Sequence, residues 1–202
     1  MPSADFFRNL GLFVWEEFFD PAFCARLRSE MSSASGEQAG IDEDSRIDET
    51  VRKVLRMEPE EAAKLLVMER LLALKPKLED HFQVSLADCE EPQYLMYNQG
   101  SFYLWHTDSG TRLGVRERQV SIVIFLNSAA KEPAPDCYGG GSLTFLGVLE
   151  GPLWENCPLP LEAETGLLVA FRSNLKHEVR PVTFGRRFTI ATWYGGVESS
   201  SN

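Results

Sequence analysis

Short runs of alternating apolar and polar residues dominate the second half of the chain. They are rich in β-branched and aromatic residues, and glycine, proline or asparagine separates one run from the next. Alternation with a period of two predicts strands that bury one face. The predicted strands cover about residues 93–98, 102–108, 119–127, 142–146, 158–162, 167–171, 176–182 and 187–194.

A short strand and a helix are predicted near the N-terminus. The apolar run 11–15 favours the strand. Asp20 can then cap a helix whose first residue is Pro21, because an aspartate accepts from free N–H groups and a proline has no N–H to satisfy there. Apolar residues follow at helical spacing on one face: Phe23, Leu27 and Met31.

A second helix is predicted to begin at Pro59 and to be kinked or broken near Pro76. His81 lies near its end, where the helix dipole favours a cation, and is interpreted as structural. The stretch 32–48 is small, polar and acidic, as is typical of a solvated loop, and 51–57 is predicted to be extended. The apolar residues of the helix are expected to share one face: Ala62, Leu65, Leu66, Leu72 and Leu78.

These patterns predict an α+β protein that is mainly β. We expect a double-stranded β-helix, or jelly roll, of about eight core strands with N-terminal helices packed on one sheet. A chain of 202 residues that is 44% hydrophobic can bury one substantial core. We therefore predict a single domain over 1–202, in which 1–90 form a helical scaffold and 91–196 form the jelly-roll core.

Charge and cysteine content restrict the classes of partner and compartment. The formal net charge is −10, and an acidic protein repels nucleic-acid phosphates and anionic membrane surfaces. Neither nucleic acid nor membrane is expected as a partner, whereas a basic peptide or a small molecule is acceptable. The four cysteines form no C-x-x-C pair, no signal-peptide pattern is seen, and no apolar run is long enough to span a membrane. A cytoplasmic location with reduced thiols is predicted.

His106 and Asp108 are the first candidates for chemistry. On an extended strand, residues two apart point to the same face, so the imidazole and the carboxylate would share one cavity while Thr107 points away. Such a pair supplies two ligands of a 2-His-1-carboxylate site, which leaves coordination positions open on non-haem Fe(II). A hydrogen-bonded His–Asp couple without a metal is the plain alternative.

His177 and Arg187 would complete the site. His177 is the natural third ligand, although most single histidines are packing or surface residues. Arg187 is expected on the inward face of its strand, together with Thr189, Ala191 and Trp193. A buried arginine needs an anionic partner, and a carboxylate fits its fork-shaped guanidinium. The alternatives are an internal salt bridge and a solvent-facing side chain.

The motifs His106-X-Asp108, His177 and Arg187 occur together with the runs 139–145 and 177–182. In this order they resemble the prolyl 4-hydroxylase-like 2-oxoglutarate/Fe(II) dioxygenases, and the strand pattern from about 92 to 194 is similar too. The resemblance is greatest to the oxygen-sensing prolyl hydroxylases and their bacterial relatives. It implies hydroxylation of proline in a protein or peptide, coupled to decarboxylation of 2-oxoglutarate to succinate and CO2.

The resemblance also implies roles for single residues. His106, Asp108 and His177 would bind the catalytic Fe(II). Arg187 would pair with the far carboxylate of 2-oxoglutarate. Tyr97 would hydrogen-bond within the cosubstrate pocket, with an ordinary core aromatic as the alternative. O2 is the second cosubstrate, and ascorbate is an optional further cofactor.

One position departs from the family's pattern. The oxygen-sensing enzymes have a tyrosine that helps the arginine to hold the far carboxylate, and this chain has Phe125 there. A phenyl ring donates no hydrogen bond. Either another hydroxyl replaces it, with Thr189 as the candidate, or 2-oxoglutarate binds more weakly.

Candidate substrate contacts lie on neighbouring strands and in one loop. Tyr103 and Trp193 should each share a face with a metal or cosubstrate residue and could hold a substrate near the iron, but either could equally belong to the core. Three arginines in the loop after Asp108 are predicted to meet an acidic peptide or to steer anionic 2-oxoglutarate, with a solvated hairpin as the alternative. They are Arg112, Arg116 and Arg118.

The leading predicted function is therefore 2-oxoglutarate- and Fe(II)-dependent hydroxylation of proline in a protein or peptide. A dioxygenase that acts on another residue or on a free small molecule would use the same cofactors. A non-catalytic jelly-roll binding module with a vestigial metal site is the alternative from another class. Arg187 argues against that module, because binding a metal or a sugar alone needs no arginine there. The sequence predicts no oligomeric state.

Overall fold

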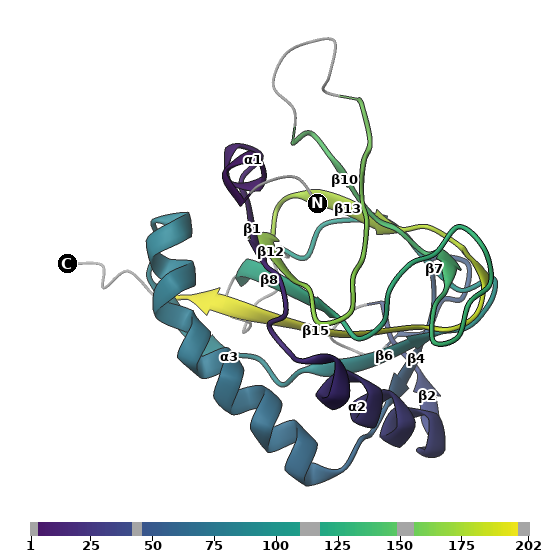
Figure 1. The fold of residues 1–202 in the computed structure, drawn as a ribbon. Coiled ribbons are helices and arrows are strands. Elements are labelled where there is room, and N and C mark those ends of the chain that lie inside the picture. The colour runs from purple at the N-terminus through teal and green to yellow at the C-terminus, as the bar shows by residue number, and fades with distance from the viewer. Residues whose placement is uncertain (1–3, 42–45, 110–117, 149–155, 198–202) are drawn as a thin grey trace.

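The described part of the chain is mainly β, with two large antiparallel sheets, a separate two-stranded sheet and a few helices (Figure 1). The computed structural model describes residues 4–41, 46–109, 118–148 and 156–197. Among these residues, no helix is both long and apolar enough to cross a membrane.

The larger sheet has β15 near its middle, paired with β8 on one side and with β6 on the other. Its strands along the main path are β1 (Leu12–Trp15), β12 (Leu168–Arg172), β8 (Arg118–Phe125), β15 (Arg187–Gly196), β6 (Gln93–Tyr97), β4 (Leu55–Met57) and β2 (Gly36–Gln38). Off this path, β5 (Leu86–Cys89) pairs with β15.

The five-stranded sheet packs on the face of the larger sheet that is opposite to the helices. Its order is β11 (Leu159–Leu161), β10 (Leu143–Leu146), β13 (Lys176–Val179), β7 (Phe102–His106) and β3 (Arg52–Lys53). A separate pair joins β14 (Val182–Phe184) to β9 (Gly139–Gly140). Each strand predicted after residue 91 is present, and the run predicted at 176–182 is divided between β13 and the first residue of β14.

Two core clusters lie on the two faces of the larger sheet. Phe188, Ile190 and Tyr194 of β15 belong to the cluster shared with the helices, whereas Ala191 and Trp193 belong to the cluster between the sheets. Period-two alternation along one strand therefore fills both cores. The prediction that Arg187, Thr189, Ala191 and Trp193 share the inward face agrees with this division.

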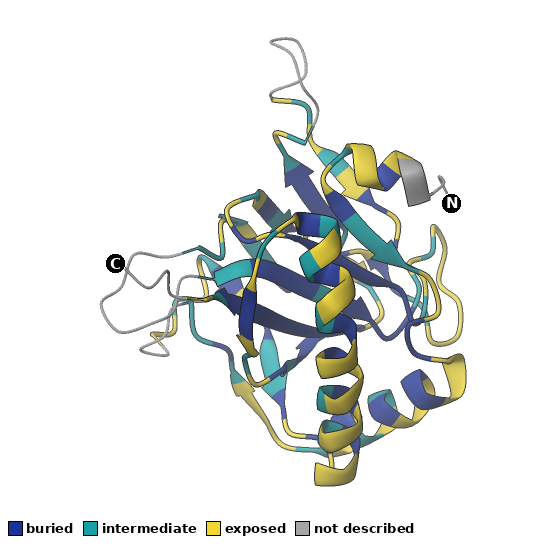
Figure 2. Cartoon of the chain, turned by 90° about the vertical axis from the view of Figure 1, so that its left-hand side faces the viewer, coloured by how far each residue is buried: buried dark blue, intermediate teal, exposed yellow. Residues whose placement is uncertain are grey.

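The helices are α1 (Ala4–Asn9), α2 (Pro21–Ser33) and α3 (Glu61–Phe82). The predicted start of α2 is confirmed, since the Asp20 carboxylate accepts from the backbone N–H of Phe23 at 2.8 Å and Pro21 is the first helical residue. The helices α2 and α3 pack on the outer face of the larger sheet, and their solvent side is exposed (Figures 1 and 2). The prediction of helices covering one sheet is thus confirmed.

Of the residues predicted to form the apolar face of α3, only Leu78 is buried. Leu65 and Leu72 are 63% and 53% exposed, and Ala62 and Leu66 are exposed too. A leucine-rich helix offers apolar residues on more than one face, and only contact with the sheet selects among them. The helix also continues through Pro76 to its end at Phe82, so the predicted break is absent. The buried residues are Ala63, Val67, Leu71, Leu74, Leu78 and Phe82.

Two further expectations for the first ninety residues need correction. The stretch 32–48 is not a loop throughout, because 36–38 form β2 against β4; its acidic residues 42–44 lie outside the described residues. His81 is not favoured as a cation, since burial and then the nearby Arg8 lower the pKa of its imidazole. It packs edge-on against Phe13 and Phe82 instead, which keeps it structural as predicted.

Candidate active site

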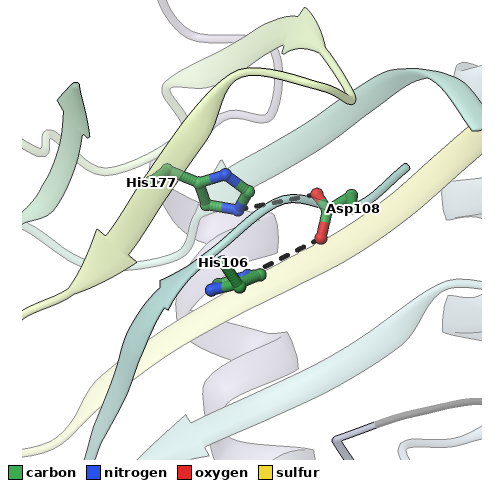
Figure 3. A group of neighbouring side chains, drawn as sticks. All are labelled: His106, Asp108 and His177. Atoms are coloured by element: carbon green, nitrogen blue, oxygen red, sulfur yellow. Dashed lines mark ion pairs between the residues drawn. The ribbon is translucent and has the colours of Figure 1, made fainter. Parts of the chain in front are cut away.

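Two adjacent strands bring His106, Asp108 and His177 together. His106 is the last residue of β7, Asp108 follows two residues later, and His177 lies on β13. The two strands are antiparallel neighbours, and His106 is directly opposite His177 in their register. Residues 71 positions apart therefore become cross-strand partners, and the carboxylate faces both rings (Figure 3).

The spacing of the three side chains suits a single metal ion. The Asp108 Oδ1 lies 3.6 Å from the His106 Nε2, and its Oδ2 lies 3.5 Å from the His177 Nε2 (Figure 3). One ligand atom from each residue lies within 4.8 Å of the others. Two imidazole nitrogens and one carboxylate oxygen on one side of an ion form the donor set of non-haem Fe(II) oxygenases.

The backbone fixes which nitrogen of each histidine can bind a metal. His106 Nδ1 donates to the Leu104 carbonyl oxygen at 2.7 Å, and His177 Nδ1 donates to the Leu175 carbonyl oxygen at 2.9 Å. A proton on Nδ1 leaves the lone pair of a neutral imidazole on Nε2. Both Nε2 atoms face Asp108, so the two rings are held in the tautomer that coordination needs.

The electrostatics also favour the metal-binding protonation state. Burial, and then the neighbouring His177, lower the pKa of His106 to about 4, so that ring is neutral at pH 7. Burial alone would raise the pKa of Asp108, but the two histidines and hydrogen bonds from Ser121 and Trp193 outweigh it and lower the pKa. The acid is therefore ionised, as a metal ligand must be.

Arg187 is a buried cation without an acidic partner among the described residues. Its exposure is 0%, and Nη1 donates to the Thr189 Oγ1 at 3.2 Å, while Nε and Nη2 have no hydrogen-bond partner. Its guanidinium lies 4.7 Å from the ring centroid of Tyr97 and 5.1 Å from that of Phe125. Because an unpaired buried charge is costly, this arrangement fits an anion that is brought by a ligand.

All the predicted site residues that the structure describes border one cavity of about 1130 Å³ between the two sheets. The metal-ligand candidates line it together with Arg187. The other predicted residues that line it are Tyr97, Thr189, Tyr103, Arg118 and Trp193. The fold therefore brings these predicted residues together around one cavity.

The predicted substrate residues have partners within the protein. The Tyr103 ring stacks on the His106 ring with 3.6 Å between centroids. Arg118 binds both carboxylate oxygens of Glu90 at 2.6 Å and lies 3.9 Å from the centroid of Trp193. The other two loop arginines, at positions 112 and 116, lie outside the described residues.

Tyr138 is a buried neighbour of Arg187 that sequence reasoning missed. Its hydroxyl has no hydrogen-bond partner in the described part of the chain. A Cβ on Gly141 would lie 3.1 Å from both the Arg187 Cδ and the Tyr138 Cε2, so the two side chains flank this glycine. Burial raises the pKa of Tyr138, and Arg187 opposes that shift. The sequence pointed to Tyr138 only indirectly, because Phe125 lacks the hydroxyl that the family's tyrosine supplies and another residue was needed to supply it.

Comparisons with known proteins agree with this geometry. Residues 92–195 match the family described as the 2OG-Fe(II) oxygenase superfamily. A PKHD-type hydroxylase of Maricaulis maris is 31% identical over 97 residues, which are 48% of this chain and only 38% of that relative.

Solved structures share the fold over nearly the whole chain. A prolyl-4-hydroxylase of Pseudomonas putida has a TM-score of 0.69 at 22% identity, covering 93% of this chain and 94% of its own. A prolyl hydroxylase of Trichoplax adhaerens, in complex with a hypoxia inducible factor oxygen degradation domain peptide fragment, has a TM-score of 0.68 at 18% identity, covering 95% and 88%. At these identities the likeness concerns the fold.

Proposed function

Because this chain belongs to the 2OG-Fe(II) oxygenase superfamily, we propose that it is a 2-oxoglutarate- and Fe(II)-dependent dioxygenase that hydroxylates proline in a protein or peptide. One observation carries the proposal: a triad of two imidazoles and one carboxylate shares a cavity with a buried arginine that has no acidic partner among the described residues. The prolyl hydroxylases among the structural neighbours support proline as the target. The two sheets would be the halves of a double-stranded β-helix in a single domain.

The triad would hold the metal. His106 and His177 present Nε2 lone pairs, and Asp108 supplies the anionic oxygen. Ser121 and Trp193 contribute to lowering the pKa of Asp108, which keeps this carboxylate ionised for the metal, and Trp193 also lines the cavity. With O2 and 2-oxoglutarate, bound Fe(II) supplies C–H hydroxylation with release of succinate and CO2.

Arg187 would bind the far carboxylate of 2-oxoglutarate. Its unpartnered Nε and Nη2 are the donors a carboxylate needs. Thr189 already contacts the guanidinium, and the Tyr138 ring lies beside the Arg187 side chain at Gly141. The hydroxyls of Thr189 and Tyr138 would replace the one that Phe125 cannot supply. Tyr97 lies against the guanidinium with its ring, which fits a wall of the pocket.

Two measurements test the proposal. The unmodified protein with Fe(II), O2 and 2-oxoglutarate should form succinate, and His177→Ala should abolish this. Lysate proteins incubated with the enzyme should then gain one oxygen on proline by mass spectrometry. Absence of succinate would contradict the dioxygenase reaction, whereas an added oxygen on another residue or on a small molecule would contradict only the choice of proline.

A further inference from the structure

A second buried arginine lies on the wall of the same cavity. Arg52 on β3 is 7% exposed, and Tyr103 is its partner in the register between β3 and β7. Its guanidinium lies 4.8 Å from the centroid of the Tyr103 ring, and that ring stacks on His106. One aromatic ring therefore separates Arg52 from a metal-ligand candidate.

The hydrogen bonds of Arg52 do not neutralise its charge. Nη1 donates to the Gly40 carbonyl oxygen at 2.5 Å and Nη2 to the Gln93 Oε1 at 3.1 Å, and both acceptors are neutral. Nε is buried without a partner, and no ion pair joins Arg52 to a carboxylate of the described residues. A neutral side chain could brace the same two acceptors, so the bracing alone does not explain a buried cation.

Strand β6 shows where Arg52 lies relative to the proposed cosubstrate pocket. Gln93 and Tyr97 are both on the cavity face of β6, and they contact Arg52 and Arg187 respectively. Four residues of a strand span about 13 Å. The two buried arginines therefore border the cavity at different places, four residues apart along β6. With 2-oxoglutarate at Arg187, Arg52 remains as a separate buried cation on the cavity wall.

Resting on the proposed function, we propose that the substrate carries a carboxylate that binds Arg52 beside Tyr103. The chain as a whole has a formal net charge of −10 and repels acids at long range. A local buried cation is therefore the feature that selects a carboxylate at this wall. The carboxylate belongs either to an aspartate or glutamate near the target residue of a peptide or to a free carboxylic acid.

Binding to the protein loaded with Mn(II) and 2-oxoglutarate tests this inference. The probes are two pools of end-capped, proline-containing peptides that differ only in Asp/Glu or Asn/Gln beside the proline, and the α-amide of N-acetylglutamate against the α-amide of N-acetylglutamine, which lacks any carboxylate. A hydrogen-bonded charge pair predicts roughly tenfold to hundredfold tighter binding of the acidic probe. Tighter binding of the acidic than of the neutral peptides identifies an acidic peptide as the substrate class. Tighter binding of the acidic probe only among the acetylated amino acids identifies a small molecule.

Variants decide whether Arg52 is responsible. Arg52→Gln should remove the preference, and Lys53→Gln should keep it, because Lys53 is the exposed neighbour on the same strand and the charge change is identical. Should Arg52→Gln fail to fold, Arg52→Lys keeps a charge without the fork and should lose part of the preference.

Equal binding of acidic and neutral probes, or a preference that survives in Arg52→Gln, overturns the inference. Succinate formation by the unmodified protein without any probe tests the proposed function separately. Failure of that reaction alongside an Arg52-dependent preference would leave a carboxylate-binding site without the oxygenase activity.

Discussion

Side chains alternate between the two faces of β15, and the two faces have different roles. On the helix side, Phe188 and Ile190 meet apolar side chains, and the Tyr194 hydroxyl donates to the Leu71 carbonyl oxygen at 2.7 Å. On the cavity side, Arg187 keeps two nitrogens without partners. Almost all polar groups in a protein interior are paired. The helix side therefore stabilises the fold, while the cavity side keeps donors for a ligand at a cost in stability.

The largest expected effect is the loss of metal binding in His177→Ala. Loss of a residue that only orients a ligand costs about 10–100-fold in metal affinity, so loss of a ligand should cost more than about 100-fold. Titration calorimetry with Mn(II) measures this. His81→Ala is the matched control, since His81 packs against Phe13 on the helix side and should leave metal affinity unchanged. Equal affinities in the two variants would contradict the site.

Arg187→Met should raise the KM for 2-oxoglutarate. Removing one partner of a buried charge pair costs about 2–5 kcal/mol, or roughly thirtyfold and more. The free energy of unfolding without ligand should stay equal or increase, because a methionine fills the space without an unpaired charge. Arg186→Met changes the exposed neighbouring arginine and should alter neither the KM for 2-oxoglutarate nor the free energy of unfolding. Steady-state kinetics and urea unfolding check both parts; an unchanged KM refutes the assignment.

Two buried tyrosines, one on each side of the larger sheet, sharpen the comparison. The hydroxyls of Tyr138 and Tyr94 both lack partners in the described structure, but Tyr138 lies between the sheets and Tyr94 under the helices. Loss of one hydrogen bond costs about 0.5–1.5 kcal/mol of binding free energy. Tyr138→Phe should therefore raise the KM for 2-oxoglutarate roughly twofold to tenfold. Tyr94→Phe should leave KM unchanged. A similar KM for both variants would mean that the Tyr138 hydroxyl meets no ligand.

The smallest effect concerns the thiol of Cys24 in the helix-side core. Burial raises the pKa of Cys24 to about 11, so the unreactive protonated thiol dominates at pH 8. Iodoacetamide at pH 8 should therefore modify the partly exposed Cys137 and leave Cys24 intact, as mass mapping of the native protein can show. Modification of both at equal rates would mean that the helix layer opens readily.

Local patterns predicted much of the fold and of the candidate site. Alternation located the strands after residue 91, and Asp20-Pro21 located the start of α2. The motif residues His106, Asp108, His177 and Arg187 were recognisable because ligand chemistry restricts residue type and order. The buried face of α3 was mispredicted, since its leucines satisfy more than one helical stripe.

The sequence by itself determined which residues alternate, where turns fall and which side chains are able to bind a metal, because these depend on neighbours a few positions away. Only the tertiary structure decided that Tyr138 flanks Arg187 and that Arg52 is buried beside Tyr103. These contacts depend on strand register and sheet packing between segments far apart in the chain. Local periodicity carries no record of such pairings, so the roles of Tyr138 and Arg52 could be inferred only from the folded chain.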